Sequence, residues 1–330
     1  MITRLSQRLQ RLCCLALILC ITSASAETVR LLTVGNSFSR NATRFLKDLA
    51  EAGGHELIHR SIVVGGASLE LHAEKARKHQ TDSKDPAGLY SNGQSLVQEL
   101  KAEPWDFVTI QQASIKSHDL STYQPYAGRL SDIIRQYAPS ARLLVHQTWA
   151  YRRDDPRFTK PSGKPGEPTS QAAMYTGLTS AYSTIAAELK AGRIPVGDAF
   201  HLADTHSSWG YVADTTFDPK QAVRPQLPNQ KHSLHVGWQW KKQKDGKIKL
   251  AMDGHHANAA GEYLGACVFY EVIFGEPVVS NSFVPAGLDA DYARFLRETA
   301  HTAVLQMQTQ EAQRSEAAPK EKVSAARIPQ

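Results

Sequence analysis

Cysteine is scarce in this 330-residue sequence, and most of it lies near the N-terminus. Cys13, Cys14 and Cys20 fall within the first 26 residues, so a chain without that segment keeps only Cys267. Such a chain cannot form an internal disulfide. The sequence therefore excludes a small disulfide-stabilised fold and indicates a domain stabilised by a packed hydrophobic core. Cys267 itself lies in the apolar run YLGACVFYEVIF, where a buried side chain is expected.

Long apolar runs are also few. One run, LCCLALILCITSA, follows three arginines and precedes Ala24-Ser25-Ala26, a small-residue cleavage motif. The run is too short to span a bilayer comfortably, and no second one follows it. The sequence predicts a signal peptide over residues 1–26 that is cleaved after Ala26. We therefore expect a secreted or periplasmic protein without stable membrane insertion, with a retained N-terminal anchor as the alternative.

A strong charge excess is absent. The formal net charge is +6, and the three arginines of the signal segment supply half of it. No basic stripe with interleaved aromatic residues occurs, so we do not expect nucleic acid as a partner. Seven of the 13 histidines lie after residue 200, yet no H-E-x-x-H and no paired Cys/His spacing accompanies them. No cofactor and no metal are therefore predicted.

The sequence does contain a regular alternation of short apolar runs and helical segments. Strands are predicted at 28–34, 57–64, 106–110, 141–148 and 193–198, and helices at 42–52, 93–102, 122–138, 170–191, 257–274 and 289–307. Near-continuous apolar strands that alternate with helices are typical of a parallel sheet covered on both faces. We expect one three-layer α/β/α sandwich with a central five-stranded parallel sheet over residues 27–310.

Three segments depart from this pattern. Residues 152–169 are rich in proline, glycine and charge, and are predicted to form an exposed loop. Residues 204–250 form a second insertion, which ends in two strand-like runs around Asp245-Gly246 and so predicts a β-hairpin. Residues 311–330 are polar and low in aromatic residues, which is typical of a disordered tail.

The ends of the predicted strands carry most of the reactive side chains. They present Ser37 in VGNSFS, Gly65 and Gly66 in VVGGAS, Gln111 and Gln112 in TIQQAS, and Asp253 and His256 in DGHH. Ligands of open parallel sheets bind at the carboxyl ends of the strands, so these groups are expected to meet there. A serine needs a base, an imidazole is suited to that role, and a carboxylate orients the imidazole. The set therefore suits nucleophilic acyl transfer.

These blocks, in this order, resemble the SGNH (GDSL-like) hydrolases. That family carries a serine in a G-D/N-S motif, a glycine after the second strand, an asparagine after the third and a late D-x-x-H. The resemblance covers about residues 28–274 and implies a flavodoxin-like sheet. It makes Ser37 the nucleophile, His256 the base and Asp253 its orienting carboxylate, with His255 as the competing base.

The resemblance also implies an oxyanion hole. Its donors would be the Ser37 N–H, the N–H of Gly65 or Gly66, and a side-chain amide from the third block. This sequence has no asparagine in that block, so the amide is carried over to Gln111 or Gln112. We therefore expect similarity to a secreted branch of the superfamily in which glutamine takes that place.

The predicted function is a secreted serine esterase that acts on a small-molecule or carbohydrate ester, with short acyl groups such as O-acetyl preferred. The aromatic residues Trp209, Tyr211, Trp238 and Trp240 are candidates for stacking on sugar rings. Two alternatives stay open, a non-catalytic carbohydrate-binding module on the same fold and a metal-dependent hydrolase. The sequence leaves the oligomeric state open.

Overall fold

The computed structural model describes residues 26–159 and 167–317. Residues 1–25, which make up most of the predicted signal peptide, lie outside the described residues, as do residues 318–330. Among the helices that the structure describes, none combines the length and the apolarity needed to cross a bilayer.

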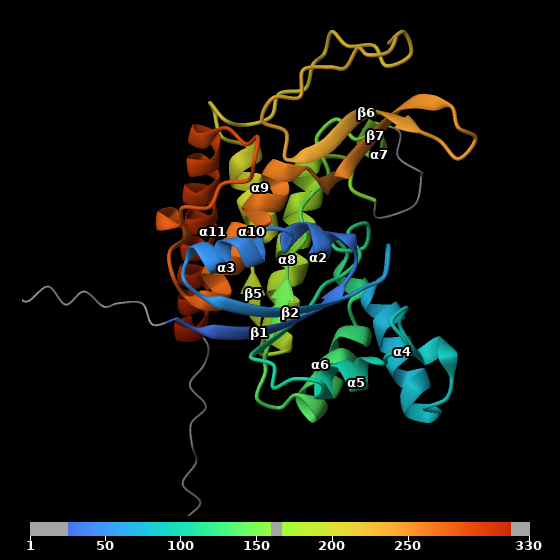
Figure 1. Cartoon of the computed structure of the whole chain (residues 1–330), viewed down its shortest axis with the longest axis vertical. Helices are drawn as coiled ribbons and strands as arrows, with labels where there is room; N and C mark the ends of the chain where they lie inside the picture. The colour runs from blue at the N-terminus through green and yellow to red at the C-terminus, as the bar shows by residue number, and fades with distance from the viewer. Residues whose placement is uncertain (1–25, 160–166, 318–330) are drawn as a thin grey trace, which may run out of the picture.

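A five-stranded parallel sheet forms the centre of the domain (Figure 1). Its strands are β1 (Thr28–Gly35), β2 (Glu56–Val63), β3 (Phe107–Ile110), β4 (Arg142–His146) and β5 (Gly192–Ile194). They are arranged in the order β2-β1-β3-β4-β5, and every neighbouring pair is parallel. This confirms the predicted α/β fold. The strand order reverses between β1 and β3, which places the expected binding crevice at the carboxyl ends of those two strands.

Helices cover both faces of the sheet. They are α2 (Ser37–Ala42), α3 (Leu46–Ala52), α4 (Leu69–Thr81), α5 (Leu96–Lys101), α6 (Tyr126–Tyr137), α7 (Pro156–Thr159), α8 (Gln171–Glu188), α9 (Val196–Asp204), α10 (Ala259–Phe274) and α11 (Ala290–Ala317). Short 3₁₀ turns occur at Pro86–Gly88, Leu120–Thr122 and Val278–Ser280. In Figure 1, α2, α3 and α10 lie on one side of β1 and β2, and α4, α5 and α6 lie on the other. Helix α11 packs against α10 and α9.

Helix α10 is the most buried of these helices, and it sets the position of α2. Its residues are apolar nearly all round, and Cys267 is fully buried among them, as expected. A Cβ at Gly265 would lie 2.9 Å from the Cα of Ala42, so the glycine allows the two helices to approach closely. Because Ser37 begins α2, this contact helps to fix the position of its side chain.

The predicted hairpin is present as an antiparallel pair, β6 (His235–Lys242) and β7 (Ile248–Ala257). Strand β7 continues through the D-x-x-H block, so Asp253 and His256 lie near the end of a strand. Asn258 follows directly and caps α10 by accepting from the N–H groups of Ala260 and Gly261, at 3.0 and 3.1 Å. The hairpin therefore delivers the D-x-x-H block to the edge of the core.

Several predicted boundaries change. The helix predicted at 42–52 is two helices, and the strand predicted at 193–198 ends at Ile194, because α9 begins right after Pro195. Helix α4 has no counterpart in the prediction. Residues 311–317, predicted to be disordered, continue α11. The buried Arg193 of β5 forms an ion pair with Glu311 at 3.3 Å, which holds these turns against the domain.

The segment predicted as an exposed loop at 152–169 is exposed only in part of its described length. Arg152 is fully buried and Asp155 is 4% exposed, and residues 156–159 form the short helix α7. The exposed-loop prediction is therefore wrong at the start of the segment. The Arg152 side chain instead contacts Met252 of β7 at 3.5 Å, and Arg157 lines a pocket that also includes His255 and His256 of that strand.

Candidate active site

The first strand ends in a tight turn that presents Ser37. Asn36 caps α2, because its side-chain oxygen accepts from the N–H of Phe38 at 2.9 Å. Ser37 is the first residue of the helix, so its own N–H has no partner within the helix. At Gly35 a Cβ would lie 2.3 Å from the Oγ of Ser39 and 2.8 Å from the Cγ of Gln111, so a larger residue would displace the turn.

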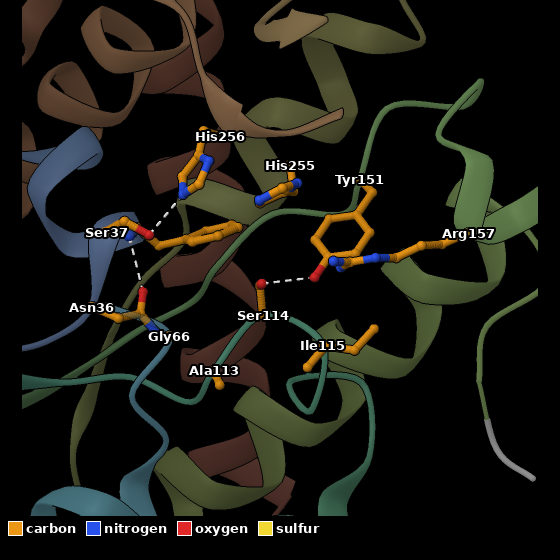
Figure 2. Close-up of a pocket in the computed structure, with 11 residues that line it drawn as sticks. Asn36, Ser37, Gly66, Ala113, Ser114, Ile115, Tyr151, Arg157, His255 and His256 are labelled. Atoms are coloured by element: carbon orange, nitrogen blue, oxygen red, sulfur yellow. Dashed lines mark hydrogen bonds between the residues drawn. The ribbon is translucent and has the colours of Figure 1, made fainter. Parts of the chain in front are cut away.

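Ser37, His256 and Asp253 form a continuous chain of hydrogen bonds. The Oγ of Ser37 lies 2.9 Å from the Nε2 of His256 (Figure 2). The Nδ1 of His256 lies 2.9 Å from the Oδ2 of Asp253, and the Oδ1 of Asp253 accepts from the His256 backbone N–H at 3.0 Å. A carboxylate only accepts, so Nδ1 carries the proton of the neutral imidazole. Nε2 is then left to accept from the serine hydroxyl.

The electrostatics keep Asp253 ionised. Burial raises its pKa, but the hydrogen bonds from the side chain and backbone of His256 outweigh burial and hold the pKa well below its usual range. His255 also approaches the same carboxylate, with its Nδ1 3.2 Å from Oδ1. Burial lowers the pKa of His255 despite that contact, which favours the neutral ring. The site therefore pairs one carboxylate with two adjacent imidazoles.

A metal-ligating arrangement has a single candidate in the part of the chain that the structure describes. The ligand atoms of Asp253, His255 and His256 lie within 4.8 Å of one another. The contacts of Asp253 with His256, and of His256 with Ser37, already account for two of these residues. The proton relay therefore uses two of the three residues that a metal at this place would need.

Trp149 connects the nucleophile to the base. Its indole N–H donates to the backbone oxygen of His255 at 2.9 Å. Its ring stacks on Phe38 with centroids 4.4 Å apart, and on Phe200 with centroids 4.5 Å apart. The side chain is fully buried. One rigid aromatic stack therefore supports both the turn at Ser37 and the end of β7.

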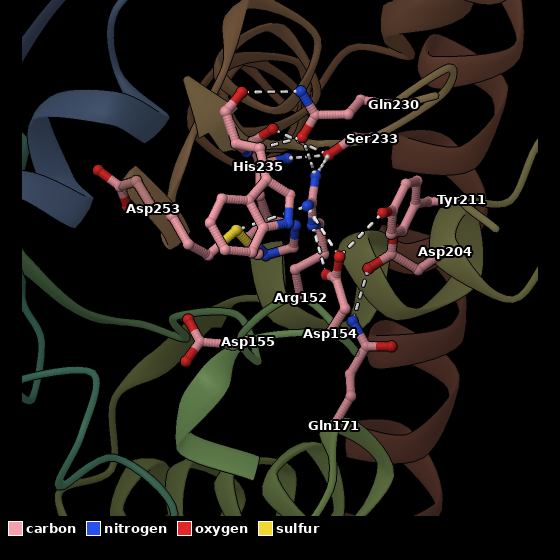
Figure 3. A network of polar contacts seen from close by, with 12 residues as sticks. Arg152, Asp154, Asp155, Gln171, Asp204, Tyr211, Gln230, Ser233, His235 and Asp253 are labelled. Carbon is pink, nitrogen blue, oxygen red and sulfur yellow. Dashed lines mark hydrogen bonds and ion pairs between the residues drawn. The ribbon is translucent and has the colours of Figure 1, made fainter. Parts of the chain in front are cut away.

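A buried arginine holds the other side of the D-x-x-H block (Figure 3). The Arg152 guanidinium binds both carboxylate oxygens of Asp154, at 2.6 and 2.9 Å, and donates to Gln230 at 2.7 Å. Its backbone N–H donates to the oxygen of Gly254 at 2.7 Å. At Gly254 a Cβ would lie 2.4 Å from the Oδ2 of Asp155, so glycine is needed there. The segment after β4 thus fixes the strand that carries Asp253 and His256.

A pocket of about 290 Å³ opens directly in front of Ser37 and His256. It is lined by Asn36, Ser37, Phe38, Gly66, Ala113, Ser114, Ile115, Tyr151, Arg157, His255 and His256. Of the two candidate glycines, Gly66 lines this pocket and Gly65 does not. Gly66 has a φ of +68°, and its N–H forms no hydrogen bond with any other described residue.

The two candidate glutamines lie behind the pocket. The Nε2 of Gln111 donates to the Oδ1 of Asn36 at 2.8 Å, and its Oε1 accepts from the hydroxyl of Ser39 and from the Nδ1 of His146, the latter at 3.1 Å. Gln111 thus supports the turn from beneath.

Gln112 points the other way. Its Oε1 accepts from the N–H groups of Leu69 and Ala113, at 3.2 and 2.8 Å, and its Nε2 donates to the oxygen of Thr122 at 2.8 Å. Both glutamines are buried, and neither lines the pocket. The structure therefore brings neither glutamine amide into the pocket, because both amides have partners elsewhere.

Ser114, Tyr151 and Arg157 line the pocket, and the sequence analysis gave none of them a catalytic or binding role. Ser114 follows the third strand, and its Oγ lies 2.9 Å from the hydroxyl of Tyr151. The Arg157 guanidinium lies 4.9 Å from the centre of the Tyr151 ring. Ser114 could have been selected from the sequence, because it follows a predicted strand. Arg157 could not, because it lies in the segment predicted as an exposed loop.

The aromatic residues proposed for sugar stacking are absent from the lining of this pocket. Tyr211 is 2% exposed, with the Arg152 guanidinium 4.5 Å from its ring centre. Trp209 stacks on Tyr292 and Phe295 of α11. The packing of these two residues therefore gives them a structural role in the insertion.

A family model described as Domain of unknown function (DUF4886) matches residues 30–184. That range contains Ser37 and Gly66 and ends before Asp253. A search of the curated proteins found no match to the chain.

Solved structures give a further comparison. The chain is similar to a DUF4886 family protein from Bacteroides uniformis, with 25% identity and a TM-score of 0.64, over 84% of this chain and 95% of that one. It is also similar to the periplasmic domain of a lipopolysaccharide acetyltransferase from Salmonella ser. Paratyphi A, with 12% identity and a TM-score of 0.41, over 76% and 84% of the two chains. A phospholipase A1 from Streptomyces albidoflavus has 16% identity and a TM-score of 0.36, over 73% and 97%. The first similarity supports the α/β fold, and the two lower TM-scores carry no inference about activity.

Proposed function

We propose that the protein is a secreted serine esterase of the SGNH type. The observation that carries this proposal is the relay from Ser37 through His256 to Asp253, with both junctions at 2.9 Å, at the edge of a pocket. The order of the sequence blocks supports the same assignment. A non-catalytic binding module would have no need of a serine, a base and an orienting carboxylate in that geometry.

In the proposed acylation step, the Oγ of Ser37 attacks the ester carbonyl carbon while the Nε2 of His256 accepts the hydroxyl proton. Asp253 stabilises the imidazolium that forms, since it stays ionised. The tetrahedral intermediate collapses as His256 gives the proton to the leaving alcohol, and an acyl-enzyme remains. A water molecule then loses a proton to His256 and attacks the acyl carbon. The second tetrahedral intermediate collapses as His256 gives that proton to the Oγ of Ser37, which releases the acid and restores the enzyme.

The oxyanion would be stabilised by two backbone donors, the N–H groups of Ser37 and Gly66. We assign the third donor to Ser114. When the Tyr151 hydroxyl donates to the Oγ of Ser114, the serine keeps its own hydrogen free to donate into the pocket. In this proposal the Ser114 hydroxyl takes the place of the glutamine amide expected from the sequence. The third block would then supply a donor to the oxyanion hole without an asparagine.

The proposed substrate is a short-acyl ester of a small molecule or a carbohydrate. A pocket of about 290 Å³ lies at the lower limit of typical ligand sites, which favours a small acyl group. The predicted signal peptide supports a substrate that lies outside the cytoplasm.

The test compares residues 27–330 of the natural sequence with Ser37→Ala in the hydrolysis of 4-nitrophenyl acetate and butyrate. Ser208→Ala, at an exposed position, is the matched control. We expect hydrolysis by the natural protein and by the control, and loss of the enzymatic rate in Ser37→Ala. Equal rates in all three proteins would contradict the assignment of Ser37.

The two alternative functions, a binding module and a metal-dependent hydrolase, predict different results in the same assay. A binding module would leave all three proteins inactive. A metal-dependent hydrolase using Asp253, His255 and His256 would lose its activity in the presence of a chelator and regain it with added zinc. The proposed serine esterase keeps its rate after chelation.

A further inference from the structure

Arg157 occupies an unusual place in the pocket. It lies in α7, where its backbone N–H is held by the Oδ1 of Asp155 at 2.9 Å, and its side chain reaches over Tyr151 toward the pocket (Figure 2). The guanidinium forms no ion pair with any residue that the structure describes. An exposed arginine with no acidic partner among the described residues is available to bind an anion.

The lining of the pocket has no acidic side chain to compete with an anion, and the nearby carboxylate of Asp155 accepts from the Arg157 backbone N–H at 2.9 Å. No aspartate or glutamate is among the residues that line it, and Arg157 is the one lysine or arginine there. The nearby carboxylate of Asp253 lies on the far side of the His256 ring and is held by both histidines. The lining thus changes from neutral donors at Ser114 and Tyr151 to a full positive charge at Arg157.

We propose that the substrate of this esterase carries a carboxylate close to the ester group, and that Arg157 binds that carboxylate. The inference rests on the proposed function and specifies its substrate class. A guanidinium presents parallel N–H donors that match the two oxygens of a carboxylate, and such charge-assisted pairs are stronger than neutral hydrogen bonds. Arg157 is thereby a specificity residue, distinct from the groups that act on the ester itself.

The carboxylate can belong to either half of the ester, so the test has two arms. The acyl arm compares mono-4-nitrophenyl adipate with 4-nitrophenyl hexanoate, which has the same chain length without the charge. The alcohol arm compares 4-acetoxybenzoate with its methyl ester. Each substrate is assayed with the natural protein, Arg157→Gln and Arg157→Lys, and with Arg294→Gln as a control on the exposed face of α11. Rates without enzyme and with Ser37→Ala are subtracted.

We expect Arg157→Gln to lower kcat/KM about 10- to 100-fold for the charged ester in one of the two arms, with little effect on its neutral partner. Arg157→Lys should retain part of that activity, and Arg294→Gln should change nothing. The arm that responds identifies which half of the ester carries the carboxylate. An equal effect of Arg157→Gln on charged and neutral esters, or no effect on either, would overturn the inference.

A binding experiment tests the carboxylate site at Arg157 separately from the esterase activity. Mono-4-nitrophenyl adipate and 4-acetoxybenzoate are each titrated into Ser37→Ala and into the double variant Ser37→Ala/Arg157→Gln by calorimetry. Weaker binding to the double variant supports the carboxylate site even if the natural protein hydrolyses no ester, in which case the proposed function alone fails. Hydrolysis of the neutral esters without any Arg157-dependent binding leaves the esterase assignment standing and refutes the carboxylate site.

Discussion

Replacing Gln111 with leucine tests whether this residue acts on the substrate or supports the turn at Ser37. Leucine fills a similar volume but cannot form the hydrogen bonds of the amide. Ser39 and His146 would each lose the acceptor oxygen that Gln111 gives them, and Asn36 would lose one of its two donors. All of these groups are buried.

The expected cost follows from these contacts. A buried polar group without its partner costs about 1–3 kcal/mol, and two groups here lose the partner that the structure gives them. The Oδ1 of Asn36, which caps α2, also loses the hydrogen bond from Gln111. Together, these losses should lower the free energy of unfolding by about 3–5 kcal/mol. The activity should fall as well, because Asn36 caps the helix that begins at Ser37 and donates to the backbone oxygen of Ala67 at 2.8 Å, beside Gly66.

Urea unfolding and 4-nitrophenyl acetate hydrolysis measure the two effects on the same samples. Gln308→Leu, at an exposed position of α11, is the matched control and should change both by little. A Gln111→Leu variant with unchanged stability and a kcat lower by about 10²- to 10³-fold would behave like an enzyme that has lost an oxyanion-hole donor. That result would refute the supporting role and restore the assignment made from the sequence.

Three further predictions follow from the site and its surroundings. Ser114→Ala should lower kcat for 4-nitrophenyl acetate by about 10²-fold with little change in the melting temperature, and an unchanged kcat would remove Ser114 from the oxyanion hole. Trp149→Phe keeps the aromatic stack but loses the bond to the backbone of His255, so it should lower the free energy of unfolding by about 1–3 kcal/mol and also reduce kcat, as urea titration and steady-state kinetics would show. Burial raises the pKa of Asp204 to about 7, so the folded state binds the proton more tightly than the unfolded state does, and stability should fall as the pH rises from about 4 to about 7. Asp204→Asn should flatten that slope in urea titrations at pH 5 and pH 8, and an identical slope in both proteins would contradict the raised pKa.

Much of the fold could be predicted because buried parallel strands are nearly continuous apolar runs. Val108 and Leu144 are examples, since both are buried at the centre of predicted strands. Ser37, Asp253 and His256 could be selected because their motifs are local and lie at strand ends. The start of α9 was missed although Pro195 precedes it, because the apolar residues around the proline also suit a strand.

The direction of the two glutamines could not be predicted. Successive side chains after a strand point to opposite sides, and Gln111 and Gln112 do so, one toward Asn36 and the other toward Thr122. Which side faces the pocket depends on where the chain turns after Ile110. Arg157 was unpredictable for a different reason, because only the tertiary packing of the segment after β4 brings it into the same pocket as Ser37.

The proposed esterase mechanism requires Ser37 to be a nucleophile that His256 activates. A fluorophosphonate reagent, followed by intact-protein and peptide mass spectrometry, tests this without assuming a substrate. We expect one covalent adduct, located on Ser37, which forms in the natural protein, is absent from Ser37→Ala and forms far more slowly in His256→Ala. An unmodified natural protein, or an adduct that persists in Ser37→Ala, would contradict it.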